Sequence, residues 1–136
     1  MGLRLTSKRS LILDTCALFW WHMGMSPITA VAKQAIADPQ VEKFVSAATA
    51  WELGTKYRSG REPAFAPLAT NVAAVVRFHG FRELALSIDH AAHATELPPH
   101  HKDPFDRMII AQALLEGMSV ATSDGNFSAY GVQVTW

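Results

Sequence analysis

The sequence predicts an α/β fold, a three-layer α/β/α domain with a central, mostly parallel sheet. Short apolar runs typical of buried strands alternate along the chain with helical segments, which is the pattern of a parallel sheet covered by helices on both faces. No repeat, low-complexity segment or long linker divides the 136 residues. We therefore expect a single domain over 1–136, in which 1–10 form a basic N-terminal arm.

The first elements follow from short local patterns. The apolar run at 10–13 is predicted to be a buried strand, and 16–21 a short helix behind it. Ser26 and Pro27 suit the cap and the first position of a helix that runs to about Asp38. We expect a second strand at 44–46.

The middle of the chain is predicted to be mainly helical. A helix at 47–57 ends at Ser59-Gly60, and 61–67, with two prolines, is expected to be a loop. A helix at 68–79 and a strand at 84–88 follow, and then Asp89 caps a helix at 91–97. For the helix at 47–57 we expect a packed side made by Ala50, Trp51, Leu53 and Gly54.

The stretch from 98 to 124 frames the predicted site. Asp103 is expected to cap a helix whose first residue is Pro104, with Asp106 in the place of the acidic partner of a capping box. This helix is almost wholly apolar, so we expect it to be nearly buried and to end at Gly117. Strands at 118–122 and 132–134 complete the expected sheet.

Composition limits the kind of protein. Formal net charge is zero, so any role in nucleic-acid binding must rest on local basic patches. The apolar fraction of 49% favours a partner that covers some apolar surface. The single cysteine, Cys16, fits a reducing compartment. The apolar run at 11–21 contains Asp14 and lacks a cleavage site, so we expect no signal peptide or membrane span and a cytoplasmic location.

Acidic residues follow the ends of the predicted strands. Asp14 and Asp124 each come just after a strand, and the ligand crevice of an open parallel sheet lies beyond the carboxyl ends of its strands. Asp106, in the first turn of the neighbouring helix, should come close to both, with Glu52 of the 47–57 helix at the edge. Clustered carboxylates repel, so they become protonated or bind cations, and all-oxygen ligands favour Mg²⁺ or Mn²⁺ over zinc.

Each acid also has a purely structural interpretation. Asp106 could merely complete a capping box, Asp14 and Asp124 could be turn residues, and Glu52 could be a solvated helix charge. His101 is expected in an exposed loop with His100, where it could reach a substrate phosphate.

Four segments resemble PIN-domain ribonucleases, specifically VapC-type toxins of bacterial toxin–antitoxin pairs. They are LILDT at 11–15 with LFWW at 18–21, SAATAWEL at 46–53, HKDPFDR at 101–107 with AQA at 111–113, and ATSD at 121–124 with Phe127 and Tyr130-Gly131. The resemblance covers nearly the whole chain. It implies metal ligation by Asp14, Asp106 and Asp124, a catalytic role for these residues and Glu52, and an accessory role for Asp103. The candidate substrate contacts are Thr15, Lys102, Arg107 and Ser123.

The resemblance also implies an activity and partners. It implies Mg²⁺-dependent hydrolysis of structured RNA such as transfer or ribosomal RNA, a homodimer, and a small antitoxin that covers the crevice. One alternative is a catalytically silent PIN-fold module that binds RNA or protein. Another is a phosphatase of the haloacid-dehalogenase kind with Asp14 as nucleophile, although such enzymes usually carry a second Asp where this chain has Cys16.

Overall fold

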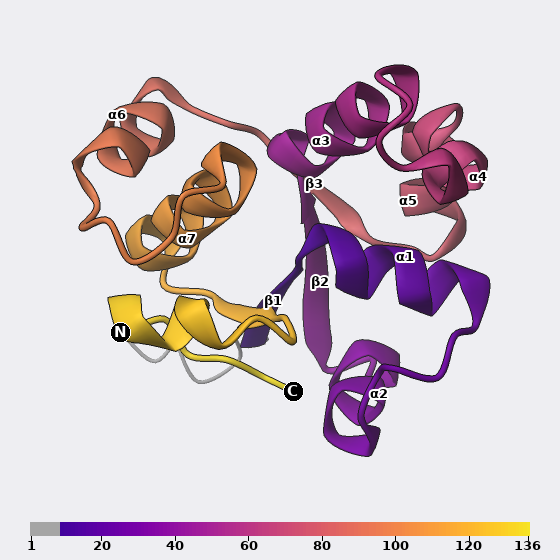
Figure 1. Cartoon of the computed structure of the whole chain (residues 1–136). Coiled ribbons are helices and arrows are strands. Elements are labelled where there is room, and N and C mark those ends of the chain that lie inside the picture. Colours follow the sequence, from indigo (N-terminus) through magenta and orange to yellow (C-terminus); the bar gives the residue numbers. More distant parts are fainter. Residues whose placement is uncertain (1–8) are drawn as a thin grey trace.

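A four-stranded, all-parallel sheet forms the centre of the molecule (Figure 1). The computed structural model describes residues 9–136, so most of the predicted basic arm lies outside the described residues. The strands lie in the order β3-β2-β1-β4. Their bounds are β1 Arg9–Leu13, β2 Val41–Ser46, β3 Arg82–Leu84 and β4 Ser119–Ala121.

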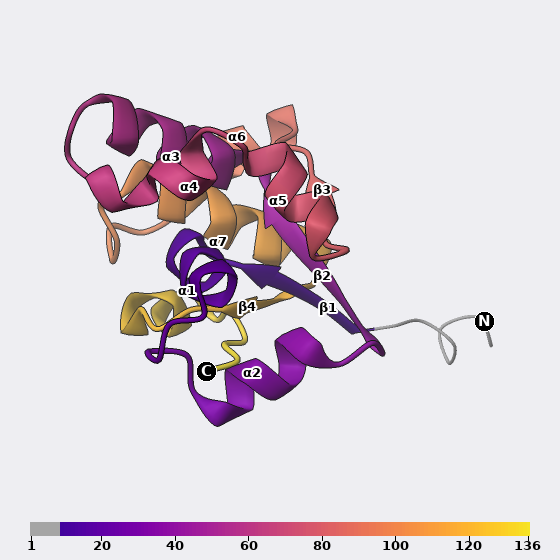
Figure 2. The same ribbon diagram turned by 90° about the vertical axis from the view of Figure 1, so that its right-hand side faces the viewer.

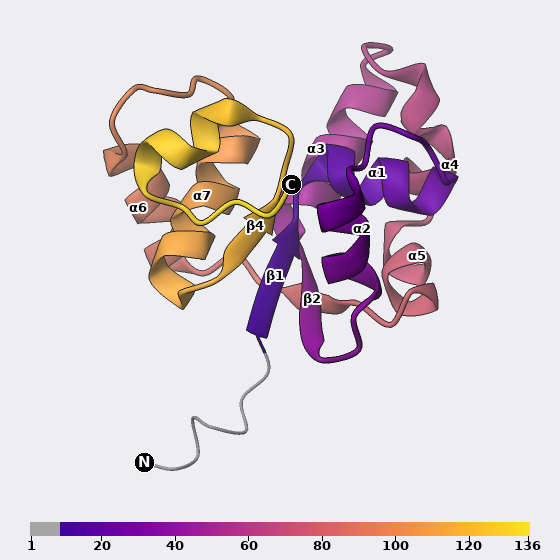
Figure 3. The same cartoon turned by 90° about the horizontal axis from the view of Figure 1, so that it is seen from below.

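Helices cover both faces of this sheet. The α-helices are α1 Thr15–Met23, α2 Ala30–Ala37, α3 Ala47–Arg58, α4 Ala66–Ala69, α5 Val72–Phe78, α6 Ile88–Glu96 and α7 Pro104–Glu116, and the 3-10 helices are η2 Pro63–Phe65 and η3 Gly125–Tyr130. Seen from below, α6, α7 and the yellow η3 lie on one side of the sheet, and α1, α2, α4 and α5 lie on the other (Figure 3). In the side view, α3 and α4 lie at one end of the molecule and α2 at the other (Figure 2). The predicted three-layer α/β/α fold is confirmed.

Two apolar cores hold the layers together, and alternate residues of β1 face each of them. Leu11 and Leu13 belong to the core shared with α1, α2, α4 and α5, whereas Ile12 belongs to the core shared with α6, α7 and η3. This alternation is what the pleat of a strand imposes, since successive side chains point to opposite faces. A segment buried on both faces is therefore apolar throughout, as the buried part of β1, residues 11–13, is.

The strand register brings the carboxyl ends of the central strands together. Leu13, the last residue of β1, lies opposite Val45 of β2 and Ala121 of β4. The next backbone N–H, that of Asp14, still donates to the carbonyl of Ala121 at 3.1 Å. The residues that follow β1, β2 and β4 therefore emerge at one edge of the sheet.

Several predicted boundaries were wrong because the caps lie elsewhere. Thr29, not Ser26, caps α2, since its Oγ1 accepts from the Ala32 N–H at 3.1 Å. Ser87, not Asp89, caps α6 in a reciprocal capping box with His90. The strand expected at 84–88 was misplaced, since β3 lies at Arg82–Leu84 and α6 begins at Ile88.

The segment from 61 to 79 also differs from the prediction. The expected loop at 61–67 contains η2 and the beginning of α4. The expected helix at 68–79 is divided into α4 and α5, because the chain leaves helical geometry at Asn71, with φ −157°. The expected strand at 132–134 is reduced to one parallel bridge between Val120 and Val134.

Of the residues predicted to form the packed side of α3, Leu53 is buried, but Ala50 and Trp51 are exposed. The buried residues of this helix are Ala48, Thr49, Glu52 and Leu53, while Trp51 is 60% exposed and packs edge-on against the ring of Phe105. The helix is turned so that Glu52, rather than the larger Trp51, faces the interior. The expected burial of α7 holds for 109–113 but fails at its end, where Leu115 is 47% exposed. Within the described part of the chain, we find no helix with the length and apolar character of a membrane span.

Candidate active site

Asp14 is buried at the end of β1, where it also caps α1. Its Oδ1 accepts the N–H of Ala17 at 2.8 Å, and the residue is only 6% exposed. The pKa of Asp14 is raised to about 6, mainly by burial and also by the charges of Glu52 and Asp124. Hydrogen bonds from Thr122 and Ala17 act in the opposite direction. Asp14 therefore combines a structural cap with membership of an anionic cluster.

Asp106 lies in the first turn of α7 but is not part of a capping box. Asp103 caps the helix as predicted, because its Oδ1 accepts from the N–H groups of Phe105 at 2.8 Å and Asp106 at 3.3 Å. In a capping box, the N–H of Asp103 would donate to the carboxylate of Asp106, but it donates to His101 Nδ1 at 3.2 Å instead. The capping-box interpretation of Asp106 is therefore wrong, because its carboxylate does not take part in the helix cap.

The charge environment of Asp106 is the strongest electrostatic feature of the site. Burial, together with the charges of Asp103, Glu52, Asp14 and Asp124, raises the pKa of Asp106 to about 8. A carboxyl group with this pKa holds its proton near neutral pH unless a cation replaces it. The acids that the sequence placed at one edge of the sheet therefore do act on one another.

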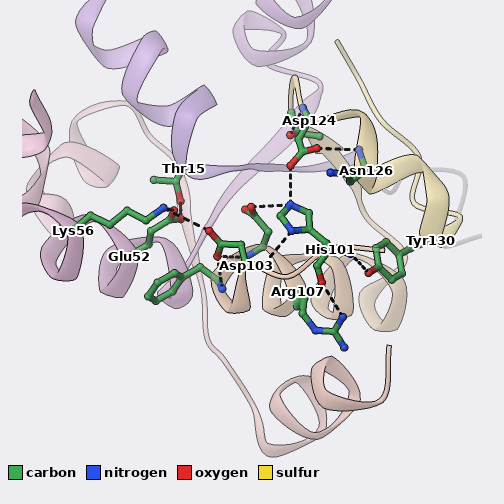
Figure 4. Close-up of polar contacts among 12 residues, drawn as sticks. Thr15, Glu52, Lys56, His101, Asp103, Arg107, Asp124, Asn126 and Tyr130 are labelled. Atoms are coloured by element: carbon green, nitrogen blue, oxygen red, sulfur yellow. Dashed lines mark hydrogen bonds and ion pairs between the residues drawn. The ribbon is translucent and has the colours of Figure 1, made fainter. Parts of the chain in front are cut away.

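His101 joins two of these acids (Figure 4). Its Nε2 lies 2.7 Å from Asp124 Oδ2 and 3.1 Å from Asp106 Oδ2. His101 lies in a loop as expected, but the loop does not expose it, since its side chain is 11% exposed. The sequence signal that marks it is its place two residues before the Asp103 cap, within the same motif as Asp106.

Glu52 is held by a second set of contacts, on the α3 side of the site. Its Oε1 accepts the hydroxyl of Thr15 and its Oε2 accepts Lys56 Nζ, each at 2.5 Å. The residue is 5% exposed, so it is not a solvated helix charge. Lys56 also lies 3.6 Å from Asp103 Oδ2. Burial lowers the pKa of Lys56, but the hydrogen bond and charge of Glu52 outweigh this and raise it. No sequence motif singled out Lys56 as a residue of the site.

The predicted substrate contacts differ in their surroundings. Lys102 and Ser123 are exposed, whereas Thr15 is buried against Glu52. The guanidinium of Arg107 donates to four backbone carbonyls, those of Ala94, Leu97, Pro98 and His101, at 2.7–3.1 Å. These bonds fasten the loop between α6 and α7, so we assign Arg107 a structural role in place of substrate binding.

The arrangement fits a hard divalent cation. Ligand atoms of His101, Asp106 and Asp124 all lie within 4.8 Å of one another. Because His101 Nδ1 accepts an N–H, the proton of the neutral ring is on Nε2, which then donates to the carboxylates. The donors available to a cation here are therefore the carboxylate oxygens of Asp106 and Asp124, which suit Mg²⁺ or Mn²⁺.

Comparison with known proteins identifies the fold. The family model described as PIN domain matches residues 11–133. Among solved structures, Mycobacterium tuberculosis VapC20, described as a Sarcin-Ricin loop cleaving toxin, is 22% identical, with a TM-score of 0.58 and coverage of 90% of this chain and 95% of that one.

Two further solved structures are similar over most of their length. VapBC2 from Rickettsia felis, bound to a promoter DNA fragment, is 12% identical, with a TM-score of 0.62 and coverage of 92% and 96% of the two chains. FitAcB from Neisseria gonorrhoeae is 20% identical, with a TM-score of 0.62 and coverage of 93% and 96%. A comparison with curated protein sequences found no match. At these identities the structural likeness is one of fold.

Proposed function

Because this chain belongs to the PIN domain family, we propose that it is a metal-dependent endoribonuclease that acts in the cytoplasm as the toxin of a toxin–antitoxin pair. The observation that carries the proposal is the cluster of Asp106 and Asp124 with His101, whose ligand atoms lie within 4.8 Å of one another, and the charge environment of Asp106 agrees with it. The Asp106 pKa of about 8 arises from burial beside four other acids, so the site is poised to exchange a proton for a cation.

The structural neighbours support the choice of substrate and partner. VapC20 is described as a toxin that cleaves the Sarcin-Ricin loop, and VapBC2 is described as bound to promoter DNA. We therefore propose structured RNA, such as ribosomal or transfer RNA, as the substrate, a small antitoxin as the partner, and a homodimer as the assembly.

We assign each side chain a task from its contacts. Asp106 and Asp124 would hold the cation, and His101 would orient both through Nε2. Bound Mg²⁺ or Mn²⁺ would lower the pKa of a water molecule and stabilise charge on the scissile phosphate. Asp14, whose Oδ1 already caps α1, would act through water, because Mg²⁺ keeps several of its waters. Glu52 supplies a fixed negative charge. Attack by water rather than by the RNA 2′-hydroxyl would leave 5′-phosphate and 3′-hydroxyl ends.

A cleavage assay on total RNA tests the proposal. Wild-type protein should cut RNA in Mg²⁺ and not in EDTA at matched ionic strength, and the fragments should be substrates for an exonuclease that requires a 5′-phosphate. Asp106→Asn should abolish cleavage. Asp89→Asn, which makes the same change at an exposed position in the first turn of α6, should cut like wild type.

The two alternatives make different predictions for this assay. A silent PIN-fold module predicts RNA or protein binding without cleavage by the wild-type protein, and this outcome would refute the proposal. A phosphatase with Asp14 as nucleophile predicts release of phosphate from a small phosphomonoester. The family match and the presence of Cys16 where such phosphatases carry a second acid both disfavour this alternative.

A further inference from the structure

We infer that the site takes one divalent cation, beside Asp106 and Asp124, because the Lys56 ammonium group occupies the position of a second cation beside Glu52 and Asp103. This inference rests on the proposed function and extends it to the number of metal ions. Two-metal nuclease sites hold their ions about 3.5–4 Å apart between shared carboxylates. Here the acids divide into two groups, and a protein cation already lies in one of them (Figure 4).

The first group is the one that remains open to a metal ion. It consists of Asp106 and Asp124 with His101 between them, and their ligand atoms lie within 4.8 Å of one another. Among the residues 9–136, no other group of three or more His, Cys, Asp or Glu side chains meets this geometry. Neither Glu52 nor Asp14 belongs to it.

The second group already holds a positive charge at Glu52. One carboxylate oxygen accepts from the Thr15 hydroxyl and the other from Lys56 Nζ, each at 2.5 Å. A Mg²⁺ ion that bound Oε2 on this side, at about 2.0–2.1 Å, would overlap Nζ. An ion elsewhere on this carboxylate would be repelled by the ammonium group, whereas the neutral His101 ring places no positive charge beside Asp106 and Asp124.

Asp103 is held by the helix it caps and forms a longer ion pair with the same lysine. Its Oδ1 accepts the first N–H groups of α7, and its Oδ2 lies 3.6 Å from Lys56 Nζ. Lys56 thus joins α3 to the start of α7 and places a positive charge between two acids. A second metal ion at this position would likewise offset the negative charges of Glu52 and Asp103. Here the ammonium group of the protein itself does so.

Counting bound Mn²⁺ tests the inference without measuring activity. Wild-type protein should bind one Mn²⁺ per chain at saturation, by calorimetry and by the electron paramagnetic resonance signal of free Mn²⁺. Lys56→Met removes the ammonium group while keeping a long side chain, so it should bind two. Lys33→Met removes a lysine charge on the exposed surface of α2 and should bind one.

A second variant keeps the test valid if Lys56→Met fails to fold. Glu52→Gln should still bind one Mn²⁺, because Glu52 is not a ligand, although with lower affinity because a nearby negative charge is gone. Two ions on the wild type, one ion on folded Lys56→Met, or loss of the ion in Glu52→Gln would each overturn the inference.

The outcomes separate this inference from the proposed function. RNA cleavage by a wild type that binds two ions would refute the single-ion inference and leave the nuclease proposal intact. A wild type that binds one ion and cuts no RNA would refute the nuclease proposal while the count of one ion stands.

Discussion

Replacing Asp106 with Asn should stabilise the metal-free protein. The pKa of Asp106 is raised from 3.8 to about 8 by burial and by four neighbouring acids, so folding at neutral pH forces this group to take up a proton. Between pH 3.8 and neutrality, each pH unit lowers the free energy of unfolding by at most about 1.36 kcal/mol. Protonation of Asp106 therefore costs the folded state at most about 4 kcal/mol at neutral pH. Asn keeps the size of the side chain and can still accept the His101 N–H, but it carries no charge.

The assay is thermal unfolding of two proteins in two buffers of equal ionic strength. In EDTA, the free energy of unfolding of Asp106→Asn should exceed that of wild type by about 1–4 kcal/mol. Its melting temperature should be higher by roughly 3–4 °C for each kcal/mol in a chain of this length. In Mg²⁺ at a hundredfold excess over its dissociation constant, wild type should gain about 2.7 kcal/mol. Asp106→Asn should lose most of this gain, because one of the two proposed ligands is gone.

Asp89→Asn controls for the loss of a negative charge from the first turn of a helix. Asp89 is exposed on α6, so its replacement should lower stability by about 0.3–1 kcal/mol through the helix dipole and leave the Mg²⁺ response unchanged. If Asp106→Asn behaves in the same way as this control, Asp106 has only a structural role at the start of α7, and the argument from its charge environment is refuted.

Three further predictions concern pH, the α7 cap and Arg107. Because the folded pKa values of Asp106, about 8, and Asp14, about 6, exceed the unfolded value of 3.8, the folded state binds more protons between about pH 4 and 8. Stability in EDTA should therefore fall as pH rises through this window, and a melting temperature that increases up to pH 8 would contradict the assignment. In denaturant unfolding, the free energy of unfolding of Asp103→Ala should be lower than that of wild type by about 0.5–2 kcal/mol, whereas Asp103→Asn keeps the cap. An Ala variant as stable as wild type would refute the cap assignment. The free energy of unfolding of Arg107→Met should be lower by about 1–3 kcal/mol, because backbone carbonyls near the α6–α7 loop lose their donor. A stable Arg107→Met protein that no longer binds RNA would restore the substrate-contact role.

The position of the acids at one edge of the sheet could be predicted from the sequence. Alternating strands and helices imply parallel strands, and parallel strands bring their carboxyl ends to a common edge. Asp14 follows β1 and Asp124 follows β4, and the structure places them within electrostatic reach of each other. The ends of α7 were also readable, since Asp103 before Pro104 is a local cap signal and Gly117 takes a left-handed φ of 67°.

Local patterns were less informative where a helix has more than one plausible cap or face. Ser26-Pro27 and Asp89 are good caps by composition, yet Thr29 and Ser87 take these positions. In α3, hydrophobicity favours Trp51 over Glu52 as the buried residue, and the structure reverses this order. A buried Glu is tolerated there only because Thr15 and Lys56 satisfy both of its oxygens.

The fold class and the meeting of the acids at the sheet edge follow from the sequence, because both depend on periodicity and strand direction. The groups that surround those acids are set by contacts between segments far apart in the chain. His101 reaches Asp124 across 23 positions of the chain, and Lys56 of α3 lies beside Asp103 at the start of α7. Contacts of this kind depend on how α3, α7 and the loop before α7 pack at the edge of the sheet. A carboxylate at a strand end follows from one element, whereas the charge that faces it comes from another element and is set by their packing.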